Sequence, residues 1–179
     1  ERQMADEVPA KASDGTTNGS DGVGKSGGKG PVFRVVAQYI KDLSFENPNA
    51  PRSLVQPGEK PGVKVDVGVS VKKIANNTFE SVLSFEANAS QSSTALYNLE
   101  LEFAGLFHIE NMPNESLEPV LMVNCPALLF PFVRRLVADL TRDGGFAPLW
   151  LDPIDFAALY LQNRKAQSAS PELKSTLSS

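Results

Sequence analysis

The 179-residue sequence has one cysteine, one histidine and one tryptophan. The single cysteine, Cys125, excludes a disulfide within the chain and fits a reducing compartment. No apolar run approaches the roughly 20 residues that span a bilayer, and the first seven residues lack the apolar core of a signal peptide. We therefore expect a cytoplasmic protein that does not insert into a membrane.

Lysine and arginine are missing from the sixty residues between Ile74 and Val133. The net charge of the whole chain is only -4, so its acidity is local. A local field of one sign selects oppositely charged partners, which predicts a basic protein partner, although an ordinary solvated face stays open as the simpler interpretation. The pI near 5.1, without a basic patch, argues against nucleic acid. The stretch contains Glu80, Glu86, Glu100, Glu102, Glu110, Glu115 and Glu118.

Large apolar side chains are almost absent from the first thirty residues. Such a segment cannot bury enough surface to offset its ordering entropy, so we expect residues 1–31 to be disordered. The same argument predicts a flexible tail at 168–179 and a single folded domain at 32–167. Formal phosphate-loop and dinucleotide-loop matches lie within 19–27, but no strand precedes them and a glycine-rich stretch follows. Both motifs depend on a strand and a helix around them, so no nucleotide or other cofactor is expected.

Four segments have the alternation and the residue types of β-strands. They are 32–40 continuing toward Phe45, 63–71 with five alternating valines, 79–86 and 95–109. The crossover loop, Asn49 to Gly62, separates the first two, and short polar turns join the others. The pattern predicts a four-stranded antiparallel meander with one apolar face and one solvated face. In the fourth strand, Leu99, Leu101 and Phe103 would share the apolar face, and Asn98, Glu100 and Glu102 the solvated face.

The period changes after Ile109. A short helix is predicted at 115–124, ending before Cys125, and a long amphipathic helix at 126–143, bent at Pro131 and ended by Gly144. A second, C-terminal helix is predicted from an Asp152 N-cap to about residue 167. Strands followed by helices make this an α+β domain.

The first turns of the long helix are apolar on more than one face. One sheet cannot bury all of these side chains, so either a second subunit packs there or the excess lines a groove. Both are possible in a symmetric oligomer, and Leu129 and Val133 are the candidates for such a contact.

Three sequence blocks resemble the signatures of the bacterial protein-export chaperone SecB family. They are Asp42–Pro51 (DLSFENPNAP), Cys125–Phe132 (CPALLFPF) and Pro148–Phe156 (PLWLDPIDF). The resemblance covers roughly 32–163. It implies a homotetramer, a dimer of dimers, that acts without ATP as a holdase for unfolded precursor proteins and delivers them to the SecA translocase motor.

The resemblance also implies roles for particular residues. Acidic residues on the outer sheet face would bind the motor, and the opposite face of the fourth strand would form subunit contacts. Clients would bind in grooves beneath the crossover loop and the second helix, although that loop lacks the aromatic residue found in many relatives. The implied motor-binding residues are Asp42, Glu46, Asn98 and Glu100; the subunit contacts are Leu99, Leu101 and Phe103; and the client-groove candidates are Phe45, Phe130 and Phe156.

Two alternatives remain at this point. An enzyme would have to use Cys125, His108 or the carboxylates, but a buried structural cysteine is the more common case, and Glu100 and Glu102 share one environment. No catalytic residues and no metal ligands are therefore predicted. A non-chaperone adaptor could bind a folded basic partner through the acidic face.

Overall fold

The computed structural model describes residues 30–55 and 61–169. The loop motifs at 19–27, most of the predicted N-terminal tail, the middle of the crossover loop and the last ten residues lie outside these ranges. The residues predicted to form the folded domain, apart from 56–60, are described. The second helix continues two residues beyond the predicted boundary at 167.

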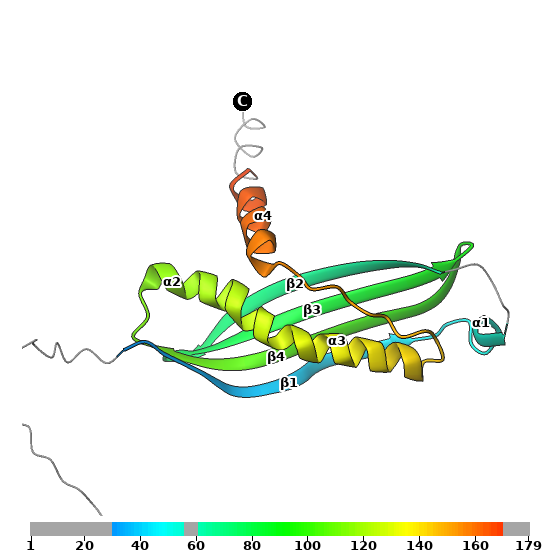
Figure 1. Ribbon diagram of the computed structural model, residues 1–179, viewed down its shortest axis with the longest axis horizontal. Coiled ribbons are helices and arrows are strands. Elements are labelled where there is room, and N and C mark those ends of the chain that lie inside the picture. The colour runs from blue at the N-terminus through cyan, green and yellow to red at the C-terminus, as the bar shows by residue number, and fades with distance from the viewer. Residues whose placement is uncertain (1–29, 56–60, 170–179) are drawn as a thin grey trace, which may run out of the picture.

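Four long strands form one antiparallel sheet: β1 Val32–Glu46, β2 Gly62–Ala75, β3 Thr78–Gln91 and β4 Thr94–Glu110 (Figure 1). Their spatial order is β1-β4-β3-β2. The last three strands form a meander joined by tight turns. β1 pairs with the edge of β4 that faces away from β3, and the crossover loop, which includes the short helix α1 (Arg52–Val55), connects β1 to β2 at the other edge of the sheet. The predicted α+β fold with its antiparallel sheet is confirmed.

The two faces of the sheet differ as the alternation predicts. Valines of β2 lie opposite alternate residues of β3, such as Val67 opposite Phe85, and this face is covered by helices. The other face carries the intervening polar residues, such as Asp66 opposite Glu86. Because neighbouring residues point to opposite sides of a strand, a single register fixes both faces at once.

The helical layer is one continuous segment rather than the two predicted helices. It comprises α2 (Asn114–Pro119), the π-helical turn η1 (Val120–Asn124) and α3 (Cys125–Asp143). The predicted break before Cys125 is wrong. The amide of Cys125 bonds to the carbonyl of Val120, five residues earlier, so the wider turn carries the helix past Pro126, which has no amide hydrogen to donate.

Taken together, this segment of residues 114–143 is long and apolar enough to cross a bilayer by length and composition. The sequence reasoning overlooked it because Glu115, Glu118 and the prolines interrupt the apolar run. Core helices of soluble proteins meet the same criterion, and here buried side chains of α3 pack in one core with the sheet.

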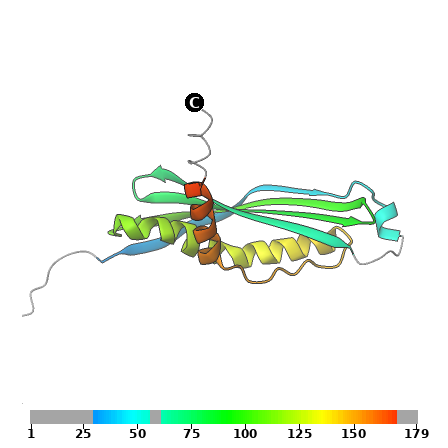
Figure 2. The same cartoon turned by 90° about the horizontal axis from the view of Figure 1, so that it is seen from above.

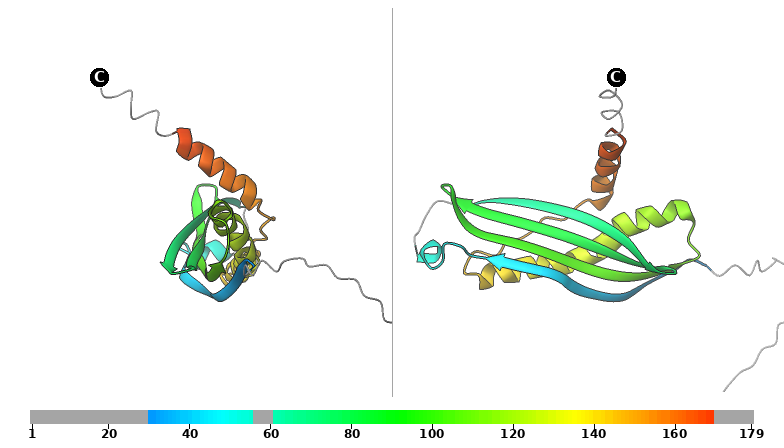
Figure 3. Two further views of the ribbon diagram at one scale, coloured as in Figure 1. Left: turned by 90° about the vertical axis from the view of Figure 1, so that its left-hand side faces the viewer. Right: turned by 180° about the vertical axis from the view of Figure 1, so that it is seen from behind.

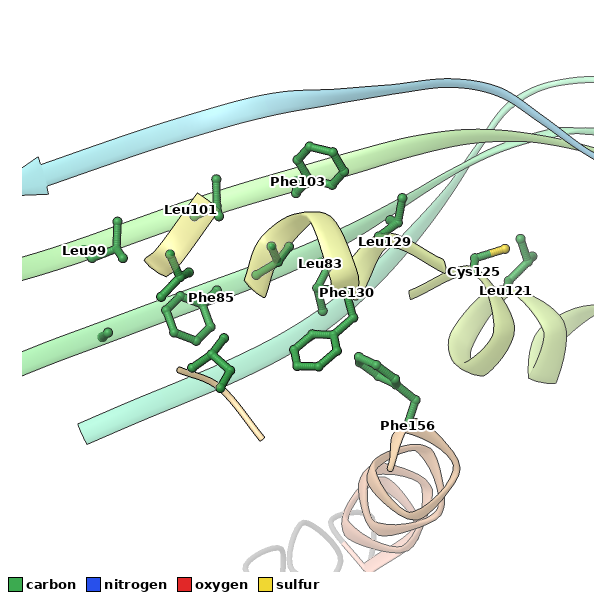
Figure 4. Packing of buried hydrophobic residues seen from close by; sticks show 14 of the residues in the cluster. Leu83, Phe85, Leu99, Leu101, Phe103, Leu121, Cys125, Leu129, Phe130 and Phe156 are labelled. Carbon is green, nitrogen blue, oxygen red and sulfur yellow. The ribbon is translucent and has the colours of Figure 1, made fainter. Parts of the chain in front are cut away.

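The core lies between the sheet and α3, as Figure 4 shows. Leu129 is fully buried and projects toward β4 at Gly105. A Cβ atom at Gly105 would lie 2.9 Å from Leu129 and 2.7 Å from the ring of Phe107, so the helix can approach the sheet this closely only over a glycine. The largest fully buried side chains include Leu83, Phe85, Leu99, Leu101, Phe107, Leu129, Val133 and Val137.

The C-terminal helix α4 (Phe156–Ala169) projects away from the body of the domain in Figure 1, and it points toward the viewer in Figure 2, where the domain is seen from above. Its N-cap is Asp155, whose carboxylate accepts a hydrogen bond from the amide of Ala158 at 2.9 Å. The predicted Asp152 cap is wrong by three residues, because Asp155 provides the acceptor for the third helical amide. Phe156 anchors the start of α4 by an edge-on contact with Phe130 of α3, with ring centroids 5.8 Å apart.

Replacing Leu129 by alanine should destabilise the fold strongly. The side chain is 0% exposed, and its removal leaves a cavity over Gly105, with an expected cost of about 2–5 kcal/mol in the free energy of unfolding. Leu161→Ala is the matched control, because Leu161 is 55% exposed on α4 and its truncation should cost less than about 1 kcal/mol. Urea unfolding of both variants measures the difference, and equal losses would contradict this description of the core.

Candidate functional site

No helix within residues 30–55 and 61–169 lies over the outer face of the sheet, as the back view in Figure 3 shows. Three of the predicted motor-binding residues, Asp42, Glu46 and Glu100, are exposed on this face, and Asn98 is half-buried beside them. The register places them together, because Glu46 lies opposite Asn98 and Ser44 opposite Glu100. The sequence therefore identified residues that the fold brings into one patch.

This patch also contains carboxylates that the sequence reasoning did not include among the site residues. Glu102 lies opposite Asp42, and Glu86 lies opposite both Glu100 and Asp66. The signal that could have found them is the outward position of each in its strand, combined with the pairing of β2, β3 and β4. We call the set Asp42, Glu46, Asp66, Glu86, Glu100 and Glu102 the acidic face.

Cations are sparse on the acidic face. Lys64 pairs with Asp66 at 3.1 Å, and both side chains are largely exposed. Across the part of the chain that the structure describes, the other five carboxylates form no salt bridge. These five charges are thus available to a cationic partner.

A buried carboxylate lies on the same outer surface but away from the acidic face. Glu80 of β3 accepts hydrogen bonds from the Tyr39 hydroxyl and, at 2.9 Å, from the Lys41 ammonium, both from β1. The hydrogen bond from Tyr39, and then that from Lys41, lower the pKa of Glu80. The same bond to Glu80 raises the pKa of Tyr39 to about 12. Glu80 is therefore ionised at neutral pH and fully partnered.

The predicted subunit contacts are all buried within the single chain. Each exposes less than a tenth of its surface, because α3 and the sheet cover one another at these positions. Such side chains leave little area for a second subunit, and their assignment to an interface remains a prediction. The five are Leu99, Leu101, Phe103, Leu129 and Val133.

Exposed apolar side chains gather elsewhere. Edge strand β1 exposes five aliphatic residues, and Leu128 and Phe132 of α3 are 44% and 39% exposed. Phe132 stacks on Phe103 with ring centroids 5.7 Å apart, so only part of its ring is covered. The excess apolar surface of the long helix, predicted from the sequence, is thus present. The exposed aliphatic residues of β1 are Val32, Val35, Val36, Ile40 and Leu43.

The three predicted client-groove residues do not form one lining. Phe45 stacks on Tyr97 with ring centroids 5.6 Å apart and lies against Gly144 at the end of α3. Phe130 and Phe156 contact each other in the core, where less than a tenth of each is exposed (Figure 4). The role of all three as groove-lining residues remains a prediction. Phe130 and Phe156 could line a groove only if α4 moved away from α3.

Open apolar grooves occur beside α2, η1 and α3. One of about 380 Å³ is lined by Phe33, Met112, Val120, Asn124, Ala127 and Leu128. Another of about 260 Å³ lies between β2 and α2 and is lined by Val71, Asn114, Leu117, Glu118, Leu121 and Met122. The sequence reasoning missed these residues, although flexible methionines are typical of surfaces that accept varied apolar partners.

The residues considered for catalysis have structural roles. Cys125 is fully buried, and its burial raises the pKa of the thiol to about 12, so the nucleophilic thiolate is not populated at neutral pH. His108 lies on β4, with Nε2 2.9 Å from the Glu110 carboxylate and Nδ1 3.4 Å from the Thr78 hydroxyl. Within residues 30–55 and 61–169, His, Cys, Asp and Glu side chains form no cluster of three that could hold a metal ion.

Comparison with known proteins agrees with this architecture. Residues 27–167 match the family model described as preprotein translocase subunit SecB. The protein-export protein SecB of Rhodopseudomonas palustris strain BisB5 is 50% identical over 143 residues, which cover 79% of this chain and 90% of that protein. The protein of the same name from Parvibaculum lavamentivorans is 49% identical over 152 residues, covering 84% and 90%.

A solved structure shares the fold at low sequence identity. It is a SecB-like chaperone of Mycobacterium tuberculosis in complex with a ChAD peptide from an antitoxin, with a TM-score of 0.55 and 18% identity, over 68% of this chain and 90% of that chain. The family model covers most of this chain, and the relatives match over nearly their whole length. The chain therefore belongs to the preprotein translocase subunit SecB family.

Proposed function

We propose that this protein is an ATP-independent chaperone that binds unfolded precursor proteins and delivers them to the SecA translocase motor. The observation that carries the proposal is the separation of two surfaces on a member of the SecB family. Open apolar grooves lie on the helical side, and the acidic face lies on the opposite side of the sheet. A client and a charged partner can then bind at the same time without competing.

The grooves suit extended apolar segments of unfolded chains. Burial of about 400 Å² of apolar client surface would gain roughly 10 kcal/mol, against association and ordering costs of about 4–15 kcal/mol. A single groove therefore binds weakly, whereas several grooves engaging one long chain bind well through effective concentration. Folded proteins expose few such segments, so selectivity for the unfolded state needs no sequence code. The relative that carries a bound peptide is a SecB-like chaperone.

Assembly into a homotetramer, a dimer of dimers, would supply those several grooves. Among the described strands, β1 ends the sheet and has no partner on its outer side, and it carries Val36 and Ile40, which are 53% and 44% exposed. An apolar edge strand pairs readily with another strand, and a second copy of β1 is the occupant we propose. The exposed Leu128 and Phe132 of α3 would then meet the rest of the assembly.

The acidic face is the proposed contact for SecA, with Asp42, Glu46 and Glu100 as the main charges and Asn98 at their side. A non-chaperone adaptor that binds a folded basic protein would use the same face. The two proposals differ at the grooves, because an adaptor needs no apolar surface for clients. Neither proposal assigns a reaction or a cofactor to the chain.

The purified protein should suppress aggregation of a refolding client without nucleotide. The grooves bind exposed apolar segments, so light scattering of a chemically denatured precursor should fall steeply at a slight excess of chaperone. Native mass spectrometry of the same mixture should show a tetramer with one long client bound. Unchanged aggregation at tetramer excess would eliminate the chaperone proposal and leave the adaptor.

Charge reversal on the acidic face should weaken binding to SecA while client binding persists. Asp42→Lys or Glu100→Lys each changes the local charge by two, and we expect a loss of affinity of about tenfold or more, with reduced dependence on salt. Glu115→Lys on α2 is the control, since it makes the same charge change at an exposed site away from the outer sheet face. Equal loss of motor and client binding would instead indicate damage to the fold.

Cys125 should be unreactive in the native protein. Burial raises the pKa of the Cys125 thiol and keeps it protonated. The contribution of the buried thiol to the free energy of unfolding is therefore fully present below the pKa of the unfolded state, and it is lost as the pH rises toward about 12. A maleimide reagent at pH 7.5 should label the folded protein at least 100-fold more slowly than the protein in urea. Rapid labelling of the native state would reopen the enzyme interpretation.

A further inference from the structure

The buried Glu80 lies where it can control the charge of the acidic face. Its two hydrogen-bond donors, Tyr39 and Lys41, come from β1, although β4 lies between β1 and β3 in the sheet. Ala104, opposite Tyr39 on β4, is completely buried on the outer face, as expected if the Tyr39 side chain crosses it to reach Glu80. The small Ala104 thus makes room for a contact that spans three strands.

A β-bulge occurs at Lys41. Ile40 pairs with Phe103 and Asp42 pairs with Glu102, so Lys41 is an extra residue between them. The bulge turns Asp42, Ser44 and Glu46 outward, and it turns the apolar residues that alternate with them toward the core. It is therefore a requirement for the acidic face.

The bulge leaves a choice that the apolar pattern does not decide. Either Lys41 or Asp42 can lie opposite Glu102, and electrostatics alone favours Lys41, since Asp42 opposite Glu102 places two carboxylates side by side. The observed arrangement has the two carboxylates together. Lys41 is drawn away by Glu80, whose Oε2 is 2.9 Å from its ammonium.

Glu80 is the stronger partner for Lys41 because of its burial. Its side chain is 10% exposed, so the ion pair is shielded from water more than a pair with an exposed carboxylate would be. Lys72 of β2 lies opposite Glu80 and adds a second positive charge on its other side. Without the Glu80 charge, Lys41 loses its ion-pair partner, and Asp42 and Glu102 are the carboxylates beside it in the pairing of β1 with β4.

We propose that Glu80 is a positioning residue that sequesters Lys41, and so keeps Asp42 and Glu102 free of a cation for a positively charged partner. This rests on the proposed function of the acidic face, and it adds that the face owes its negative charge to a buried carboxylate outside it. The inference needs no change of conformation beyond a rotation of the Lys41 side chain.

Glu80→Gln tests the proposal, because it preserves side-chain size and removes the charge. A tetralysine peptide serves as the cationic probe, with affinity measured from amide chemical shifts at low salt. We expect Glu80→Gln to weaken binding about three- to tenfold, as one new unit charge about 7 Å from the bound cation would do. Lys41→Met alone should bind the peptide as well as the unmodified protein or better.

The double variant separates positioning from a structural role. Glu80→Gln with Lys41→Met should restore peptide affinity to within twofold of the unmodified protein, since no cation is left to neutralise the face. Glu80→Gln with Lys72→Met is the matched control and should stay weak, because Lys72 lies on β2, remote from Asp42. An affinity in Glu80→Gln equal to that of the unmodified protein, or no recovery in the Lys41 double variant, would overturn the proposal.

The same variants distinguish this inference from the proposed function. Suppose that the tetralysine peptide responds as expected, but that SecA binds neither the unmodified protein nor any variant. The assignment of SecA as partner then fails, while the role of Glu80 stands. If SecA binds the unmodified protein and Glu80→Gln equally and the peptide does so too, the role of Glu80 fails alone. Thermal unfolding of each variant verifies that it is folded.

Discussion

The fold depends on covering a four-stranded sheet from one side only. A single helical segment, residues 114–143, lies across the apolar face, and its closest approach is set at Gly105, where no side chain stands between strand and helix. That contact buries Leu129 and Val133 completely. Because no second layer of helices is available in the described chain, the opposite face must tolerate water, and it does so with carboxylates.

Two different kinds of surface result from this one-sided cover. The helical segment has more apolar surface than the sheet can cover. Leu128 and Phe132 therefore remain exposed, and grooves form beside η1. The outer face has the converse property, because the carboxylates of the acidic face gather there, and in the described chain only Asp66 among them forms a salt bridge. The apolar grooves and the acidic face therefore lie on opposite sides of the sheet.

Much of this arrangement follows from local sequence. Alternation in β2 and β4 predicted the strands and their faces, and the block containing Asp42 and Glu46 predicted the charged patch. The continuity of the helical segment could not be predicted, because Pro126 is a helix breaker by local rules and only the wide turn before it removes the conflict. Similarly, Asp152 and Asp155 are equally good caps by residue type, and the tertiary contact of Phe156 with Phe130 decides between them.

Other features depend on pairs of residues that are distant in sequence. Whether Leu99 or Leu101 packs inside one chain or between chains depends on where the helix lies, which alternation does not specify. The partnership of Glu80 with Tyr39 and Lys41 joins residues about forty positions apart across an intervening strand. In the sequence Glu80 is one of seven glutamates in the stretch from Ile74 to Val133 that lacks lysine and arginine, and only the sheet order distinguishes it from those exposed to solvent.

The π-helical turn at Val120–Asn124 also sets the tolerance of this region to changes in length. A π-turn contains one residue more than the α-helical turn it replaces, and each residue of an α-helix rotates the following side chains by about 100°. Deletion of one residue here would replace the π-turn by an α-helical turn and leave the rotation of α2 relative to α3 almost unchanged, whereas insertion of a further residue would rotate α2 by about 100° and turn Leu117 away from the core that it packs against. Relatives should therefore lose a residue in these five positions more readily than they gain one.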